Sequence, residues 1–175
     1  GKTISEEVVL TPCKKDEEVY GMADGCMVFT REERWKEVKV GRIFKSSSCI
    51  HAGDKPGWIS NSQYLAYLDT HKRFTTEMEK LLDHYSQSGQ PIVFISDGAP
   101  WIKNWIADAY PQVISVLDFY HASEHLHDYA KAEIKDEIRR KEWVDEHVEL
   151  LLNGEVQKII DELSSLSVIS EQARQ

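Results

Sequence analysis

Two aspartates occupy positions at which metal-dependent enzymes carry ligands. Asp24 ends the short segment "EVYGMAD", Asp97 follows the apolar run "PIVFIS", and each aspartate precedes a glycine. A single Asp-Gly pair is most often a turn, but functional sites of α/β proteins gather at strand ends. Because neighbouring strands lie about 4.8 Å apart, the two carboxylates could share a divalent cation. Hard oxygen ligands favour Mg²⁺ or Mn²⁺.

A third apolar run, "VISVL", ends at Asp118 and leads into a second cluster of reactive side chains. His121, Glu124 and His125 spell H-x-x-E-H, the inverted zinc-protease box, in which the histidines bind zinc and the glutamate is the base. Such a site needs a third protein ligand, and nothing singles one out among the later candidates, Glu149, Glu155 and Glu162. Three interpretations stay open: a zinc metallopeptidase, helix-surface or capping histidines, and an accessory role for His121 beside the two aspartates.

The elements that must position these residues begin with predicted strands. Residues 18–24 are predicted to form one strand, 26–30 to return antiparallel after a glycine turn, and 35–44 to form a half-buried strand with a bulge at Gly41. Residues 45–60 are rich in Ser, Gly and Pro, which predicts a loop or excursion.

Strands then alternate with helices. Apolar residues at helical spacing predict a helix that Gly89 ends. Residues 91–96 and 113–117 are predicted to be buried strands on either side of a helix over 101–109, and the chain after His121 is predicted to be helical. Alternation of this kind indicates an α/β structure with a partly parallel sheet.

The order of the elements favours one fold. Three leading strands in hairpin style, followed by helix, strand, helix and strand, are the order of the RNase H-like fold. Other mixed α/β folds share this order loosely, and among them we expect an RNase H-like mixed sheet with flanking helices, followed by a C-terminal helical segment.

The composition restricts the partners of the protein. The chain carries 21 Lys and Arg against 30 Asp and Glu, a formal charge of −9, which argues against a dedicated nucleic-acid clamp because phosphate binding needs a basic face. The candidates for contact with DNA phosphate are Lys36, Lys39 and Arg42. Without an 18-residue apolar run, a signal-peptide core or a C-x-x-C pair, the sequence predicts a soluble, reduced intracellular protein with no membrane contact.

Three longer stretches resemble one known family. They are "VYGMADGCMVFTREERWKEVKVGRIF", "IVFISDGAPWIKNWIADAYP" and "VISVLDFYHASEHL". Together they resemble the catalytic core of DDE transposases from bacterial insertion sequences, in the group related to Mutator-type transposases, over roughly residues 17–152. The resemblance rests on the two Asp-Gly motifs, the W-x-E-V-K-V-G strand and the D-x-Y-H-x-x-E-H-L element.

The resemblance implies a role for each motif. Asp24 and Asp97 match the first and second catalytic acids of the family, which bind the metal ions, and Asp118 with His121 matches an accessory D-x-x-H element. The third acid of the family is a glutamate on a later helix, reached after a helical insertion. This chain is expected to end inside that insertion.

The same resemblance sets the expectations for organisation and function. Residues 1–126 are expected to be an incomplete RNase H-like core, and residues 127–175 the start of the helical insertion. The full-length enzyme is expected to be a homo-oligomer of the bacterial cytoplasm. It would use Mg²⁺ or Mn²⁺ to cut DNA at element ends and to join the freed 3′-hydroxyl to target DNA, whereas this fragment alone is expected to be inactive. A non-catalytic RNase H-like interaction module is the alternative beside the zinc peptidase.

Overall fold

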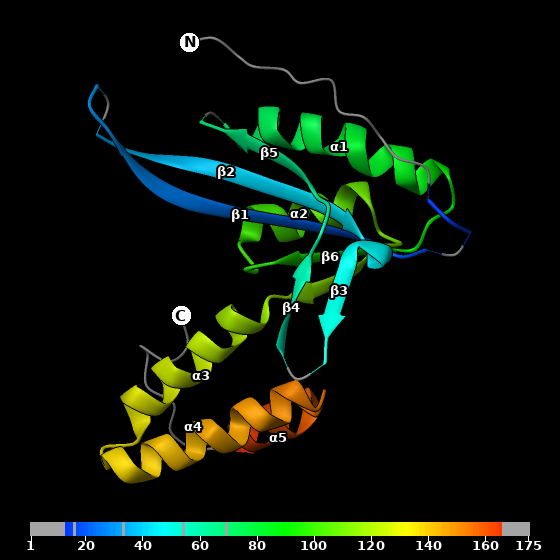
Figure 1. Ribbon diagram of the computed structural model, residues 1–175. Helices are drawn as coiled ribbons and strands as arrows, with labels where there is room; N and C mark the ends of the chain where they lie inside the picture. Colours follow the sequence, from blue (N-terminus) through cyan, green and yellow to red (C-terminus); the bar gives the residue numbers. More distant parts are fainter. Residues whose placement is uncertain (1–12, 16, 33, 54, 69, 166–175) are drawn as a thin grey trace. The chain divides into compact units, whose positions relative to one another are not determined.

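The computed structural model describes residues 13–165, apart from residues 16, 33, 54 and 69 (Figure 1). The chain divides into two compact units, of which the first ends at Val116 and the second begins at Leu117. A mixed sheet and two helices lie in the first unit, and three further helices lie in the second, so the predicted α/β class is confirmed. In the described part of the chain, no helix has both the length and the apolar character that crossing a membrane requires.

The first unit is built around one five-stranded sheet. Its strands lie in the order β5-β2-β1-β6-β7, with bounds Gln63–Tyr67 for β5, Arg34–Lys45 for β2, Val19–Thr30 for β1, Ile92–Ser96 for β6 and Ile114–Leu117 for β7. β2 pairs antiparallel with both β1 and β5, whereas β6 runs parallel to β1. The central strand β1 therefore joins an antiparallel half of the sheet to a half that the chain reaches through helices, as parallel pairing requires.

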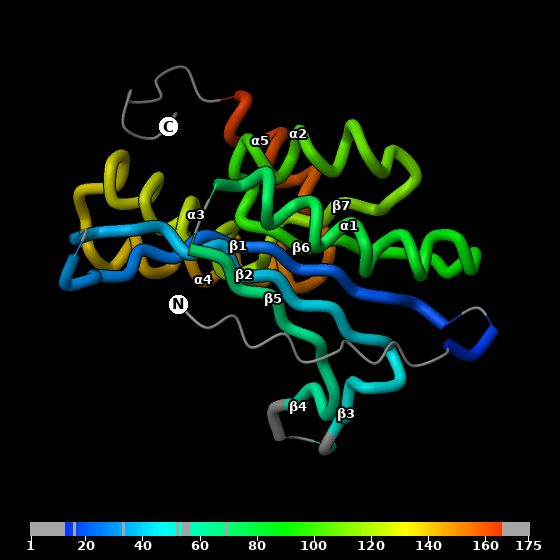
Figure 2. Tube along the Cα trace, turned by 90° about the horizontal axis from the view of Figure 1, so that it is seen from above, coloured from blue at the N-terminus to red at the C-terminus, as the bar shows by residue number. Residues whose placement is uncertain are grey.

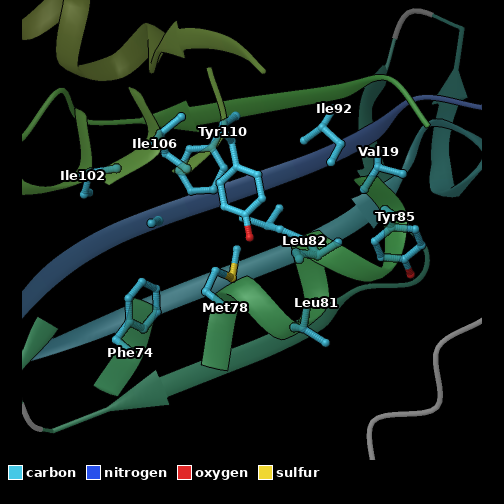
Figure 3. Packing of buried hydrophobic residues seen from close by; sticks show 13 residues of the cluster. Val19, Phe74, Met78, Leu81, Leu82, Tyr85, Ile92, Ile102, Ile106 and Tyr110 are labelled. Carbon is cyan, nitrogen blue, oxygen red and sulfur yellow. The ribbon is translucent and has the colours of Figure 1, made fainter. Parts of the chain in front are cut away.

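Two helices pack against the sheet and share one apolar core (Figure 3). α1 (His71–Gln87) precedes β6 in the chain, and α2 (Pro100–Ala109) follows it. The buried stripe of α1 is the one that helical spacing predicts, consisting of Phe74, Met78, Leu81, Leu82 and Tyr85. Side chains from α2 and the strands complete the cluster, among them Ile102, Ile106, Val19, Ile43 and Phe94.

Two glycines occupy the narrowest parts of this core. A Cβ atom on Gly21 would lie 2.7 Å from Cδ2 of Phe94, the residue paired with Gly21 on β6. A Cβ atom on Gly41 would lie 3.0 Å from Sδ of Met78 and equally close to the ring of Phe74. Because protein interiors are packed as densely as organic crystals, a side chain at either position would displace a buried neighbour.

The predicted bulge at Gly41 is therefore wrong. β1 and β2 pair without a register shift through this residue, with Ala23 opposite Gly41. Gly41 and its second neighbours Lys39 and Ile43 are all buried, as the alternation of a regular strand requires. Gly41 is a core position without a side chain, and its lack of a side chain interrupts the apolar pattern that suggested a change of phase.

The predicted turn at Gly25 is also wrong. β1 is a single strand from Val19 to Thr30, and its pairing with β2 continues through Asp24 and Gly25. The cause lies on the neighbouring strand, because the Glu37 side chain crosses over Gly25, where a Cβ atom would collide with its Oε1. Gly25 leaves space for the Glu37 side chain and does not reverse the direction of the backbone.

The stretch from residue 45 to residue 60 contains regular structure where a loop was one expectation. The short helix η1 (Ser46–Ser48) leads into β3 (Cys49–Ala52) and β4 (Lys55–Ile59), which form a separate two-stranded antiparallel sheet. Gly53 lies between the two strands with a φ of +61°, a conformation that glycine adopts without steric cost. The stretch is an excursion from the main sheet, as the composition indicated, but it is a hairpin.

Trp143 connects the three helices of the second unit, α3 (Phe119–Glu133), α4 (Glu137–Leu152) and α5 (Val156–Ser165). The Trp143 ring lies 5.2 Å from the ring of Tyr129 on α3 and stacks at 3.6 Å on His147. Its Nε1–H donates to Oε1 of Glu162 on α5 at 3.0 Å. His147 is buried, and its Nδ1 donates to the Trp143 carbonyl oxygen at 2.8 Å. The helical character predicted after His121 is confirmed.

Replacing Gly21 with alanine is expected to lower the free energy of unfolding by about 1–3 kcal/mol, because the added methyl group overlaps the buried Phe94 ring. Urea unfolding followed by circular dichroism measures this loss. The control is the double variant Gly21→Ala/Phe94→Leu, in which the smaller side chain leaves room for the methyl group. Its loss should be smaller than the sum of the two single losses, and strictly additive losses would contradict the steric explanation.

Candidate metal centre

The parallel pairing of β1 with β6 brings Asp24 and Asp97 together. Ala23 on β1 lies opposite Ser96, the last residue of β6. Asp24 follows Ala23 on β1 and Asp97 directly follows Ser96 in the chain, so the two side chains lie at the same level of the sheet. Their carboxylate oxygens lie within 4.8 Å of one another, in agreement with the spacing of neighbouring strands.

Asp97 is held by the turn between β6 and α2. Its Oδ1 accepts a hydrogen bond from the backbone N–H of Ala99 at 2.8 Å. Gly98 has a φ of +81°, which a residue with a side chain rarely adopts, and its N–H donates to Oγ of Ser96 at 3.4 Å. The glycine of this Asp-Gly pair is thus needed for the backbone conformation that orients the half-buried carboxylate.

Asp24 has a different environment, because it lies within a strand. Its side chain is exposed, and its Oδ1 accepts a hydrogen bond from the N–H of Gly25 at 2.6 Å. One oxygen of each aspartate therefore accepts a backbone N–H, which leaves the second oxygen of each carboxylate for another ligand.

The carboxylate pair fits a small divalent cation. Mg²⁺ and its oxygen ligands are separated by about 2.0–2.1 Å, so two ligand atoms on one ion are at most about 4.2 Å apart. A separation of no more than 4.8 Å is close enough for both carboxylates to bind one ion after a small side-chain adjustment. Mg²⁺ commonly binds through one or two carboxylates and completes its coordination with water or substrate phosphate. Two carboxylates are donors of the type that Mg²⁺ and Mn²⁺ favour.

The basic residues expected to contact DNA lie on two faces of β2. Lys39 is buried and forms an ion pair with Glu37, its Nζ 2.8 Å from Oε2. The Arg42 guanidinium lies over the ring of Phe44 at 5.1 Å and over the ring of Tyr64 at 5.2 Å. Within the structure, the charge of Lys39 is thus already matched by Glu37, and Arg42 is stacked between two rings.

Lys36 and Glu37 are neighbours on β2 and point to opposite faces of the strand. Lys36 is half-exposed and lies directly opposite Val28 of β1. The sequence reasoning missed the ion pair of Glu37 with Lys39; the Glu37 carboxylate reaches over Gly25, on the face of β1 opposite to the Asp24 side chain. The alternation of the W-x-E-V-K-V-G segment contained the signal, because it places Glu37 and Lys39 on the same face of the strand.

Asp118 and His121 lie in the second unit, at the start of α3. Asp118 is the N-cap of this helix, and its carboxylate accepts hydrogen bonds from the N–H groups of Tyr120 and His121, at 2.9 Å and 3.4 Å. This is the preferred chemistry for satisfying the free N–H groups of a helix start. The apolar run before Asp118 forms the strand β7, as predicted, but all four residues of β7 are exposed, so its predicted burial is wrong.

The H-x-x-E-H sequence does not assemble a zinc site within the described part of the chain. Nδ1 of His121 lies 3.3 Å from Oε2 of Glu124, as an i, i+3 pair on the helix surface. Among the described residues, no group of three or more potential ligand side chains includes Glu124 or His125. Structural and catalytic zinc sites need at least three protein ligands, so the peptidase interpretation gains no support from the structure.

The carboxylate pair is expected to bind Mn²⁺ weakly, and Asp24→Asn or Asp97→Asn should each reduce the affinity at least about tenfold. The amide keeps the size of the side chain and an oxygen that can accept the local backbone N–H, but it removes the negative charge. Mn²⁺ titration followed by electron paramagnetic resonance measures the affinity. Asp108→Asn, at an exposed position on α2, is the matched control and should bind as the wild type does. Equal affinities for all four proteins would exclude a site at Asp24 and Asp97.

Comparison of the chain with models of protein families, with curated proteins and with solved structures finds no match. The function must therefore be inferred from the geometry of the carboxylate pair and from the resemblance of the sequence motifs.

Proposed function

We propose that this chain contains the catalytic core of a DDE transposase, related to the Mutator-type enzymes of bacterial insertion sequences. The observation that carries the proposal is the carboxylate pair of Asp24 and Asp97, held side by side at the junction of β1 and β6. These are the two aspartates to which the sequence resemblance assigns the first and second catalytic acids.

The arrangement of the sheet supports an RNase H-like fold. β1, β2 and β5 are connected in sequence order and pair antiparallel, apart from the excursion that contains β3 and β4. The chain then returns through α1 to β6, on the other side of β1, and through α2 to the neighbouring β7. Three antiparallel strands followed by helix, strand, helix and strand are the order expected of an RNase H-like fold. The third strand is β5, which the sequence did not predict, because the strands predicted on either side of Gly25 are one. Asp24 lies on the first main strand, and Asp97 directly follows the fourth.

The role of the carboxylates follows from the charge of the chain. A protein with a formal charge of −9 repels the phosphate backbone of DNA. A divalent cation held by Asp24 and Asp97 would neutralise the two carboxylates and would supply Lewis-acid stabilisation of a phosphoryl oxygen. The two aspartates would hold and position the cation, which commonly keeps further coordination positions for water or phosphate.

Asp118 and His121 have accessory roles in this proposal. Both follow β7, the strand next to β6 in the sheet. Asp118 fixes the start of α3 by capping it. His121, in the first turn of that helix, would orient water or a phosphate oxygen during the reaction.

The test measures whether DNA binding depends on a metal held by the two aspartates. The affinity of the protein for a short DNA duplex is measured by fluorescence anisotropy, with and without Mn²⁺. The wild type is expected to bind about tenfold more tightly with Mn²⁺, because the cation connects the carboxylates to phosphate. This gain should disappear in Asp24→Asn and in Asp97→Asn.

Two controls distinguish the proposal from its alternatives. Asp108→Asn should keep the whole Mn²⁺-dependent gain, since its carboxylate is exposed on α2. A non-catalytic interaction module would show no gain in any of the proteins. Tight zinc binding that is lost on His125→Ala would instead favour the peptidase, and either of these results would overturn the proposal.

A further inference from the structure

The hairpin of β1 and β2 extends beyond the sheet (Figures 1 and 2). β6 pairs with β1 only as far as Ala23, and β5 pairs with β2 only from Lys39 onward. We call residues 26–29 of β1 and 35–38 of β2 the distal ribbon. Within the described part of the chain, the two strands of the distal ribbon pair with each other and with no third strand.

One face of the distal ribbon carries large apolar side chains that are exposed to solvent. Phe29 and Trp35 lie directly opposite each other with their rings in a T-shaped contact at 5.5 Å. They remain 64% and 63% exposed, and Met27, on the same face, is 59% exposed. A contiguous exposed group of this kind marks an interaction surface in soluble proteins, and a two-stranded ribbon without a partner is only marginally stable.

The two edges of the distal ribbon differ in charge. The β2 edge carries Arg34, Lys36 and Glu37, and charged side chains on an edge strand disfavour pairing with another strand. The β1 edge has no charged residue from Gly25 to Thr30, where the sequence is "GCMVFT". This segment combines uncharged, apolar and β-branched side chains, which favour addition of a strand. The β1 edge is therefore the one suited to pairing.

We propose that the β1 edge of the distal ribbon pairs antiparallel with the same edge of a second copy of this chain. Two-fold pairing of identical segments brings the exposed Met27 and Phe29 of both copies onto one continuous face of a four-stranded sheet. The uncharged edge also accounts for the choice of partner. This edge has no positively charged side chain with which to bind a polyanion such as DNA. In two anionic copies of the chain, it is a segment that can pair without placing like charges side by side.

The salt dependence of binding distinguishes a second copy of the chain from a nucleic acid as the partner. Each copy has a formal charge of −9, so the chains repel each other and added salt should strengthen their association. Binding to DNA weakens with salt because counterions must be released. Sedimentation equilibrium is expected to show a monomer–dimer equilibrium that shifts toward dimer between about 0.05 M and about 0.5 M NaCl.

A matched pair of variants locates the interface. Val28 on β1 and Val38 on β2 are both half-buried and point to the same face of the distal ribbon. Val28→Lys places a charge on the pairing edge and should weaken dimerisation at least about tenfold. Val38→Lys places the same charge on the other strand and should leave the dimer largely intact. Loss of the dimer in Val38→Lys alone would overturn the proposed edge.

The exposed thiol of Cys26 gives a readout on the wild-type protein, which does not depend on whether a variant folds. Cys26 lies on the β1 edge, so its alkylation, followed by peptide mass spectrometry, should slow as protein concentration rises. The half-buried Cys49 outside the ribbon should show no such dependence. A monomer at all concentrations, or protection of Cys26 by a DNA oligonucleotide that weakens with salt, would overturn the proposal. Neither result would bear on the metal site, because Asp24 and Asp97 are tested separately.

Discussion

The parallel pairing of β1 with β6 is the constraint on which the candidate site depends. Five residue pairs, from Val19 with Ile92 to Ala23 with Ser96, fix the register of the two strands. A shift by one residue would point one carboxylate to the opposite face of the sheet, since side chains alternate along a strand. Packing in the apolar core stabilises this register. Gly21 lies against Phe94, and Phe94 packs edge-on against the Trp105 ring at 5.6 Å. The apolar core and the carboxylate pair are thus parts of one arrangement.

Much of this arrangement could be predicted from local sequence patterns. The run over residues 91–96 is continuously apolar, and a short continuous run is typical of a central strand covered by helices. The stripe from Phe74 to Tyr85 has helical spacing, and Asp97 with Gly98 marks an abrupt change from strand to turn. The adjacency of Asp24 and Asp97 needed one further assumption, namely that their strands are neighbours. The order of the elements supplied that assumption through the expected fold.

Besides the missed strand β5 and the unexpected exposure of β7, the errors concern glycines whose role depends on residues far away in the sequence. Gly25 resembles a turn until Glu37, twelve residues later, is seen to lie over it. Gly41 resembles a bulge until Phe74 and Met78 are seen to fill the space beside it. Local periodicity contains no information about such contacts, because it describes one strand and not the side chains that pack on it. The same limit applies to Lys39 and Arg42, which local sequence shows only as two charges on one strand, although Lys39 is buried in an ion pair and Arg42 lies over two aromatic rings.

The position of Asp24 along β1 has a mechanical consequence. β1 is anchored to β6 as far as Ala23 and is free of β6 beyond it, so a force on the far end of the hairpin acts on a lever whose fulcrum is Ala23. Asp24 is one residue from the fulcrum and Thr30 is seven, or about 3.3 Å against about 23 Å at the rise of an extended strand. Rigid deflection of the tip by 1 Å would therefore move Asp24 by only roughly 0.15 Å. A deflection of the hairpin tip would thus leave the distance between the two carboxylates nearly constant.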